Sequence, residues 1–216
     1  GVAANDTVNV DAAAMTGASN DLYLGGSSSV VVTDLVRDLD ANGALNLSSI
    51  LTGDLTVTTG ALANNSGVTF ALGSGSTTIN ADEVDVGVGA GPGTEIDLTV
   101  DASALTSNSL TLNGDAEVAV DHVITDVDAS GLTGGLDIDS AASSAGSYTL
   151  TTGSGETRVS GATGTAVTMA AGNLSSDGSV SGALSDAELI VDGTGTVTVT
   201  GLLTDVNAAG FSGDSM

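Results

Sequence analysis

One acidic turn occurs three times in the chain and carries residue types from which a metal site can be built. In each turn, side-chain oxygens stand two positions apart, shortly before a Gly. The six residues are Asp38 and Asp40, Asp126 and Asp128, and Asp205 and Asn207. Calcium binds several carboxylate and carbonyl oxygens at once, so we expect these side chains to be calcium ligands. The alternative, left open here, is that they cap a corner of the fold by accepting backbone N–H groups.

Other catalytic and metal chemistry finds little support in the residue types. His122 is the only histidine, and no GxSxG motif supplies a nucleophile. In the two other copies of the repeated segment that contains His122, the equivalent residues are Asp34 and either Gly201 or Leu202. Because such different residues occupy this position, we expect His122 to be a solvated loop residue. Zinc needs three or four nitrogen or sulfur ligands, and this chain has one His and no Cys. A Walker loop needs a lysine, and the chain has none. The sequence therefore predicts that the protein is not an enzyme.

The charge balance excludes whole classes of partner. With 2 Lys+Arg against 27 Asp+Glu, the 216-residue chain has a formal net charge of −25. Nucleic acids and anionic membrane surfaces attract clustered cations, so we expect neither nucleic-acid binding nor membrane insertion. The chain has no Cys, so disulfides are excluded, and export by a route without thiol chemistry is allowed.

The elements that would position the acidic turns belong to an internal repeat. Leu110–Gly134 returns as Leu189–Gly213, and an earlier copy occupies Leu22–Gly43. Repetition of this kind is typical of solenoids, in which a unit buries its apolar face only against its neighbours. The expected organisation is one continuous solenoid over residues 1–216, with repeats 1–95 and 96–178 and a partial third repeat 179–216. Because the third copy stops at Gly213, we expect the terminal coils to pair with further β-structure.

Short apolar triplets define the expected strands. Most alternate apolar, polar and apolar residues, as in Leu55–Val57 and Val118–Val120, which is the period of a strand with one buried face. Successive triplets lie roughly 8 to 14 residues apart, so that two or three strands with their turns use about 20 residues. We predict an all-β fold, a parallel β-solenoid (β-helix) with coils of about 20 residues and a whole number of coils, about four, in each repeat. Tandem β-sandwich domains are the alternative.

A family resemblance comes from three segments. Gly17–Gly26 resembles a Gly-rich nonapeptide of calcium-binding RTX proteins. Ala4–Val8 and Val127–Gly134 look like segments that accompany such nonapeptides in bacterial surface-layer proteins and large secreted adhesins. The resemblance implies a secreted, calcium-dependent, repeat-built protein of the cell surface, with calcium as its ion.

Together these patterns favour a structural protein of an extracellular bacterial assembly, such as a surface layer, a filament or an adhesin stalk. We expect a stiff β rod that associates with itself, head to tail or laterally, with a cell-surface glycan as a further candidate partner. A rival function is a binding module for glycans or ice, to which Thr-x-Thr pairs such as Thr56 with Thr58 point. A second rival is a polysaccharide lyase of the β-solenoid type, but the two arginines, Arg37 and Arg158, offer little basic chemistry for it.

Overall fold

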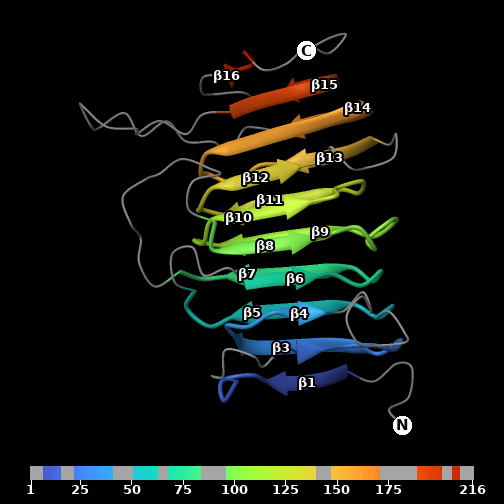
Figure 1. Ribbon diagram of the computed structural model, residues 1–216, viewed down its shortest axis with the longest axis vertical. Helices are drawn as coiled ribbons and strands as arrows, with labels where there is room; N and C mark the ends of the chain where they lie inside the picture. Colours follow the sequence, from blue (N-terminus) through green and yellow to red (C-terminus); the bar gives the residue numbers. More distant parts are fainter. Residues whose placement is uncertain are drawn as a thin grey trace, which may run out of the picture.

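The chain forms a parallel β-solenoid, which confirms the predicted fold class (Figure 1). The computed structural model describes residues 7–15, 22–40, 51–62, 68–83, 96–139, 147–170, 189–200 and 206–209. In these residues the fold is all-β, and successive coils lie roughly 22 residues apart. None of their segments is a helix long and apolar enough to cross a membrane.

Sixteen strands are present in the described ranges. They are β1 (Thr7–Asp11), β2 (Leu22–Tyr23), β3 (Ser29–Leu35), β4 (Leu39–Asp40), β5 (Leu55–Thr59), β6 (Val68–Ala71), β7 (Thr77–Ala81), β8 (Leu98–Asp101), β9 (Leu110–Gly114), β10 (Val118–Asp121), β11 (Val127–Leu132), β12 (Leu136–Asp139), β13 (Ser147–Thr151), β14 (Thr157–Ala170), β15 (Leu189–Thr200) and β16 (Val206–Asn207).

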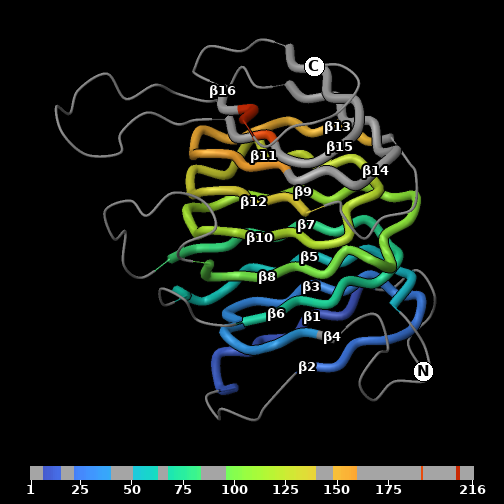
Figure 2. The backbone as a smooth tube through the Cα atoms, turned by 45° about the horizontal axis from the view of Figure 1, so that its top comes forward, coloured from blue at the N-terminus to red at the C-terminus, as the bar shows by residue number. Residues whose placement is uncertain are grey.

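Each coil contributes one strand to each of two sheets. The odd-numbered strands from β1 to β13 pair in order and form what we call the odd-strand sheet. The even-numbered strands from β2 to β12 form the even-strand sheet. The long strand β14 belongs to both, because its first part pairs with β12 and its last part with β13. Figure 2 shows the chain passing from one sheet to the other and back as it climbs the axis.

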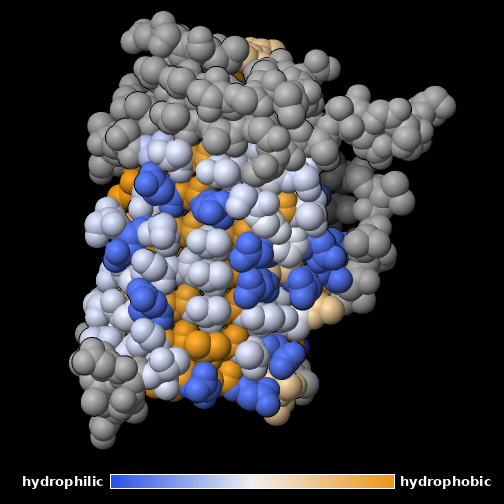
Figure 3. All heavy atoms as spheres, turned by 180° about the vertical axis from the view of Figure 1, so that it is seen from behind, coloured by the Kyte–Doolittle hydropathy of each residue, from blue (hydrophilic) through white to orange (hydrophobic). Residues whose placement is uncertain are grey.

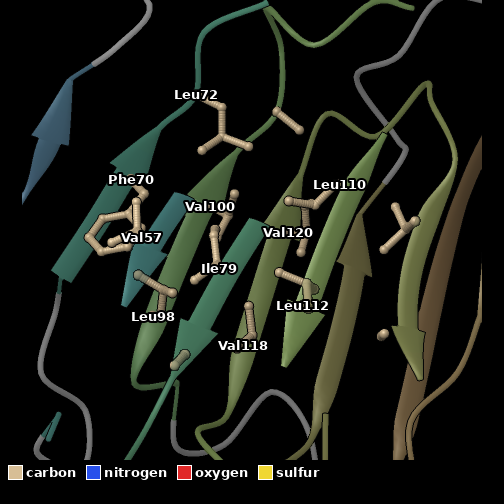
Figure 4. Packing of buried hydrophobic residues seen from close by; sticks show 14 of the residues in the cluster. Val57, Phe70, Leu72, Ile79, Leu98, Val100, Leu110, Leu112, Val118 and Val120 are labelled. Carbon is tan, nitrogen blue, oxygen red and sulfur yellow. The ribbon is translucent and has the colours of Figure 1, made fainter. Parts of the chain in front are cut away.

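The core lies between the two sheets and is built mainly from Leu and Val. Burial alternates along most strands, so that in β10 Val118 and Val120 are buried while Ala119 and Asp121 are partly exposed. This is the period of a pleated strand with one covered face. Side chains from both sheets meet in the interior, as Figure 4 shows. Phe70 is the largest of the fully buried side chains in the described residues, and apart from Tyr148 the other hydrophobic core side chains there are aliphatic.

Two equivalent corners require glycine because neighbouring coils approach closely there. A Cβ atom at Gly73 would collide with the backbone oxygen of Leu51, and one at Gly153 with the backbone oxygen of Leu132. The next residues make matching bonds, since Ser74 N–H donates to Leu51 O at 2.8 Å and Ser154 N–H to Leu132 O at 3.0 Å. The sequence copies therefore fold into matching corners.

The repeat nevertheless does not contain a whole number of coils, and that prediction is wrong. Leu22 in β2 is matched in sequence by Leu110 in β9, and Leu55 in β5 is matched by Leu136 in β12. Each match advances by seven strands, and with two strands per coil this is three and a half coils. Equivalent residues of the first two repeats therefore lie on opposite sheets. Apolar spacing alone does not distinguish two strands per coil from three, which is why the sequence did not reveal this.

The narrow core makes Phe70 the most sensitive position to truncation. Phe70→Ala should lower the free energy of unfolding by about 3–5 kcal/mol, because it removes a fully buried ring and leaves a cavity. Thr69→Ala on the same strand is the matched control, since this side chain is exposed, and should change it by less than about 0.5 kcal/mol. Urea denaturation followed by circular dichroism measures both, and equal effects would contradict the described core.

The half-coil offset can be tested with pyrene labels, because the native chain has no Cys. Thr56 and Thr78 are in-register neighbours on β5 and β7, so labels on Thr56→Cys and Thr78→Cys should form an excimer across about 4.8 Å. Labels on Thr56→Cys and Asp137→Cys, equivalent positions of two repeats, should show monomer emission only, since they lie on opposite sheets. Dilution with unlabelled protein removes contacts between molecules. Excimer emission from the second pair would contradict the offset.

Candidate functional site

Two of the predicted metal ligands bridge neighbouring coils. Thr69 N–H donates to Asp38 Oδ1 at 2.8 Å, and Thr149 N–H donates to Asp126 Oδ1 at 2.8 Å. The two bridges are the same feature in two copies of the repeat. In each, a carboxylate at a corner accepts a backbone N–H from a strand one coil further on, which is the capping role that Asp plays in turns.

The other four predicted ligands are placed less completely. Asp128 Oδ1 accepts the Ser130 N–H at 3.0 Å in a local turn. Asp40 and Asn207 lie in β4 and β16, but their side chains fall outside the described part, as does the whole of Asp205. A calcium site at these residues stays a prediction.

The acidic turns do not converge on one place. The turn of Asp38 leads into β4 of the even-strand sheet, whereas the turn of Asp126 leads into β11 of the odd-strand sheet. Over the described ranges, no group of three or more His, Cys, Asp or Glu side chains is placed to hold a metal ion. Any ion held by a turn from this part of the chain would need further oxygens from backbone carbonyl groups, from water or from a neighbouring molecule.

His122 has a structural reason for its place in the repeat. Its φ is 62°, and φ is 58° at Asp34, its counterpart one repeat earlier. Among residues with a side chain, Asp, Asn and His tolerate this left-handed region best, and the third copy has Gly201 there. The ring Nδ1 lies 3.2 Å from Asp101 Oδ1, with 44% of the His122 side chain exposed. Asp34 and His122 therefore share one backbone requirement.

A ladder of aspartates runs along the even-strand sheet and was missed by sequence reasoning. Asp101, Asp121 and Asp139 end β8, β10 and β12 and lie in register with one another. Burial raises the pKa of Asp121, Asp139 and Asp101 raise it further, and His122 lowers it. The signal was an apolar-x-apolar-Asp pattern ending each of the three strands. With Asp137, also directed outward, these residues form what we call the aspartate face.

A second concentration of carboxyl groups surrounds Glu117 at a corner. Burial raises the pKa of Glu117 from 4.5 to about 7, helped by the charges of Asp97, Glu83 and Glu156, while a backbone hydrogen bond from Gly135 lowers it. Its backbone N–H donates to Asp97 Oδ2 at 2.9 Å, and Asp97 is only 1% exposed. The carboxylate therefore loses water and gains like-charged neighbours, both of which favour the protonated form.

The odd-strand sheet carries a chemically different outer surface. Thr56, Thr78 and Thr111 form one column across β5, β7 and β9. Thr58, Asn80 and Asn113 form the column beside it. We call these six residues the threonine–asparagine face. They are directed outward and partly buried by one another. Figure 3 shows this side of the molecule, where pale side chains of near-neutral hydropathy stack along the axis beside blue hydrophilic and orange hydrophobic ones.

The asparagines of this face are held in fixed positions. Asn80 Nδ2 donates to Thr58 Oγ1 at 3.2 Å, and Asn113 Nδ2 donates to Asn80 Oδ1 at 2.9 Å. The sequence did not reveal the array because unequal loops separate its members along the chain. Only the register of the strands brings them into columns.

No protein-family model, curated protein or solved structure matches the chain. A fold by itself does not fix a function, because one architecture hosts many activities. Function is therefore inferred from the stacked coils and from the contrast between the two outer faces.

The carboxyl group of Glu117 should make stability depend on pH. Its folded-state pKa lies above its ordinary value, so its ionisation destabilises the fold as the pH rises from about 4.5 to about 7. Glu117→Gln should raise the free energy of unfolding by about 1–2 kcal/mol at pH 8, a figure reduced for partial exposure, and by roughly zero at pH 4.

Urea denaturation at the two pH values measures this difference. Asp82→Asn is the control, because Asp82 is exposed, and should change the free energy of unfolding by less than about 0.5 kcal/mol at either pH. A Glu117→Gln protein that is no more stable than the native chain at pH 8 would contradict the described corner.

Proposed function

We propose that the chain is a structural segment of an extracellular bacterial assembly, in a surface layer, filament or adhesin stalk. Its role is to act as a stiff β rod that associates with other copies. The observation that carries this proposal is the uninterrupted parallel pairing, which links all the described strands from β1 to β16 into one ladder system.

Stiffness follows from the direction of the hydrogen bonds. In a parallel sheet the backbone N–H and C=O groups bond across strands, and here the strands are stacked along the solenoid axis. Bending the rod would lengthen the bonds of both sheets, while the side chains between the sheets resist compression. The corner carboxylates of Asp38 and Asp126 add bonds between coils. Such a body transmits force without a catalytic centre.

The net charge of −25 supports a controlled form of association. Like charge keeps single rods apart and soluble, so that packing side by side depends on screening or on cations. We propose calcium as that ion, bound between rods by carboxylates of two molecules rather than within one coil. Exposed acids such as Asp126 and Asp128 would supply the oxygens.

A second candidate function is a binding module for a glycan or for ice. The column of Thr56, Thr78 and Thr111 favours it, because hydroxyl groups recur there at the spacing of neighbouring strands, about 4.8 Å. A repetitive hydroxyl surface fits a ligand that is itself repetitive. The absence of aromatic side chains from the threonine–asparagine face counts against stacking on sugar rings.

Electron microscopy and sedimentation of the purified chain test the structural role. At millimolar calcium we expect rods to collect into filaments or sheets, while far-UV circular dichroism and the melting temperature of the single rod change little. At low salt, chelation should reverse the assembly, and magnesium at equal concentration should act more weakly than calcium, because it gives up its water reluctantly. Single particles at every calcium and salt concentration would rule out the proposal.

A further inference from the structure

We propose that the threonine–asparagine face is the surface through which one copy of this chain contacts a second copy, face to face. This inference rests on the proposed self-association and names the surface that mediates it. The partner is identified by charge, because a molecule this acidic meets its own copy most easily where its surface carries no carboxylate.

The two sheets differ sharply in outward charge. On β5, β7 and β9 the outward positions are Thr and Asn only. On β8, β10 and β12 they include Asp101, Asp121, Asp137 and Asp139, with Arg158 close to Asp137 at 3.9 Å. Contact between two aspartate faces would bring eight carboxylates together. Contact between two threonine–asparagine faces brings together none, in a chain whose net charge is −25.

The neutral surface extends beyond the six defining residues in one direction and ends in the other. Asn9 and Val31 continue the column of Thr56 toward β1, in register and without charge. Asp128 follows Thr111 at the opposite end and is exposed, so it marks the limit of the neutral area. The column of Thr56 is therefore uncharged over five strands, β1, β3, β5, β7 and β9. Beside this column, Asp11 of β1 and Asp34 of β3 are exposed, so the full width of the sheet is neutral only on β5, β7 and β9.

The size of this area predicts a weak contact that gains strength by repetition. Three strands spaced about 4.8 Å apart, each about five residues long, cover on the order of 240 Å² per copy. A pair would bury on the order of 500 Å², which is below the usual size of a stable specific interface. A single pair should therefore be transient, whereas rods that touch several neighbours gain from multivalency.

Order within the face reduces the cost of contact. The Asn80 and Asn113 amides are already held by neighbouring side chains, and the β-branched threonines have restricted χ1 angles. Few rotamers need to be frozen when a second surface arrives. The rows also repeat at the same spacing in both partners, so that an antiparallel, twofold arrangement lets the rows of one copy fit between those of the other.

Salt gives this contact a recognisable signature. Charges outside the neutral area repel the partner, and monovalent salt screens them without weakening an uncharged contact. Association should therefore strengthen as sodium chloride rises from 50 to 500 mM in the presence of EDTA, about tenfold or more in Kd. An interface built on ion pairs would show the opposite trend, and one built on bridging divalent cations would not form in EDTA.

Charge variants of equal size decide which surface is used. Thr78→Glu places a carboxylate at the centre of the threonine–asparagine face, whereas Thr99→Glu places one at an outward position of β8 in the even-strand sheet. Both raise the net negative charge by one. We expect Thr78→Glu to weaken association at least tenfold in sedimentation equilibrium at 500 mM salt, and Thr99→Glu to change it less than threefold.

Two further measurements distinguish loss of the proposed contact from loss of folding and from binding of a different ligand. Thr78→Asn keeps the face neutral and should associate like the native chain, and circular dichroism must be native-like for every variant.

If the native chain assembles and both Glu variants assemble equally, this surface is wrong while the structural role stands. If no condition produces assembly, the structural role fails as well. Thermal hysteresis in ice, or retention on crystalline chitin, by a chain that does not self-associate would assign the face to a different ligand and overturn the inference.

Discussion

In-register stacking of parallel strands is the constraint on which the rest of this structure depends. Each inward position must match the residue above and below it, as Thr77 is matched by Leu110 and Leu110 by Val127. A wide aromatic core would force the two sheets apart, and the aromatic content is only 2%. The backbone bonds between coils then replace much of what a larger core provides, and every outward position becomes part of a regular array.

The sequence was sufficient to predict the fold class, but not to predict on which of the two sheets each strand of a repeat lies. Alternating triplets such as Val118–Val120 and the long internal repeat contain the period of a strand and the translation of a solenoid. They do not contain the number of strands per coil, because turns and long loops of unequal length separate the triplets. Thr56, Thr78 and Thr111 are therefore unremarkable in the sequence and aligned in the structure. Register is a property of pairing between coils.

For the candidate functional residues, too, some features could be predicted from the sequence and others could not. The repeated acidic turns were recognised from sequence, and their corner bonds through Asp38 and Asp126 match the capping alternative. Glu117 was missed because its raised pKa depends on burial and then on the charge of Asp97, which comes from the neighbouring coil. The equivalence of His122 and Asp34 was visible in the alignment of the repeats, but its cause, a positive φ, was not. Interactions between residues close in sequence can be predicted from the sequence, whereas electrostatic interactions between coils depend on how the coils stack.

The odd number of strands in a repeat gives the rod the symmetry of a twofold screw. Duplicating one repeat would add three and a half coils and turn everything distal to it by half a revolution about the axis. A surface shaped by selection on one side would thus reappear on the opposite side, free to diverge, as Thr56 and Thr58 have from Asp137 and Asp139. The parity of the repeat count then decides which way a distal element faces, so gain or loss of a single repeat reverses its orientation.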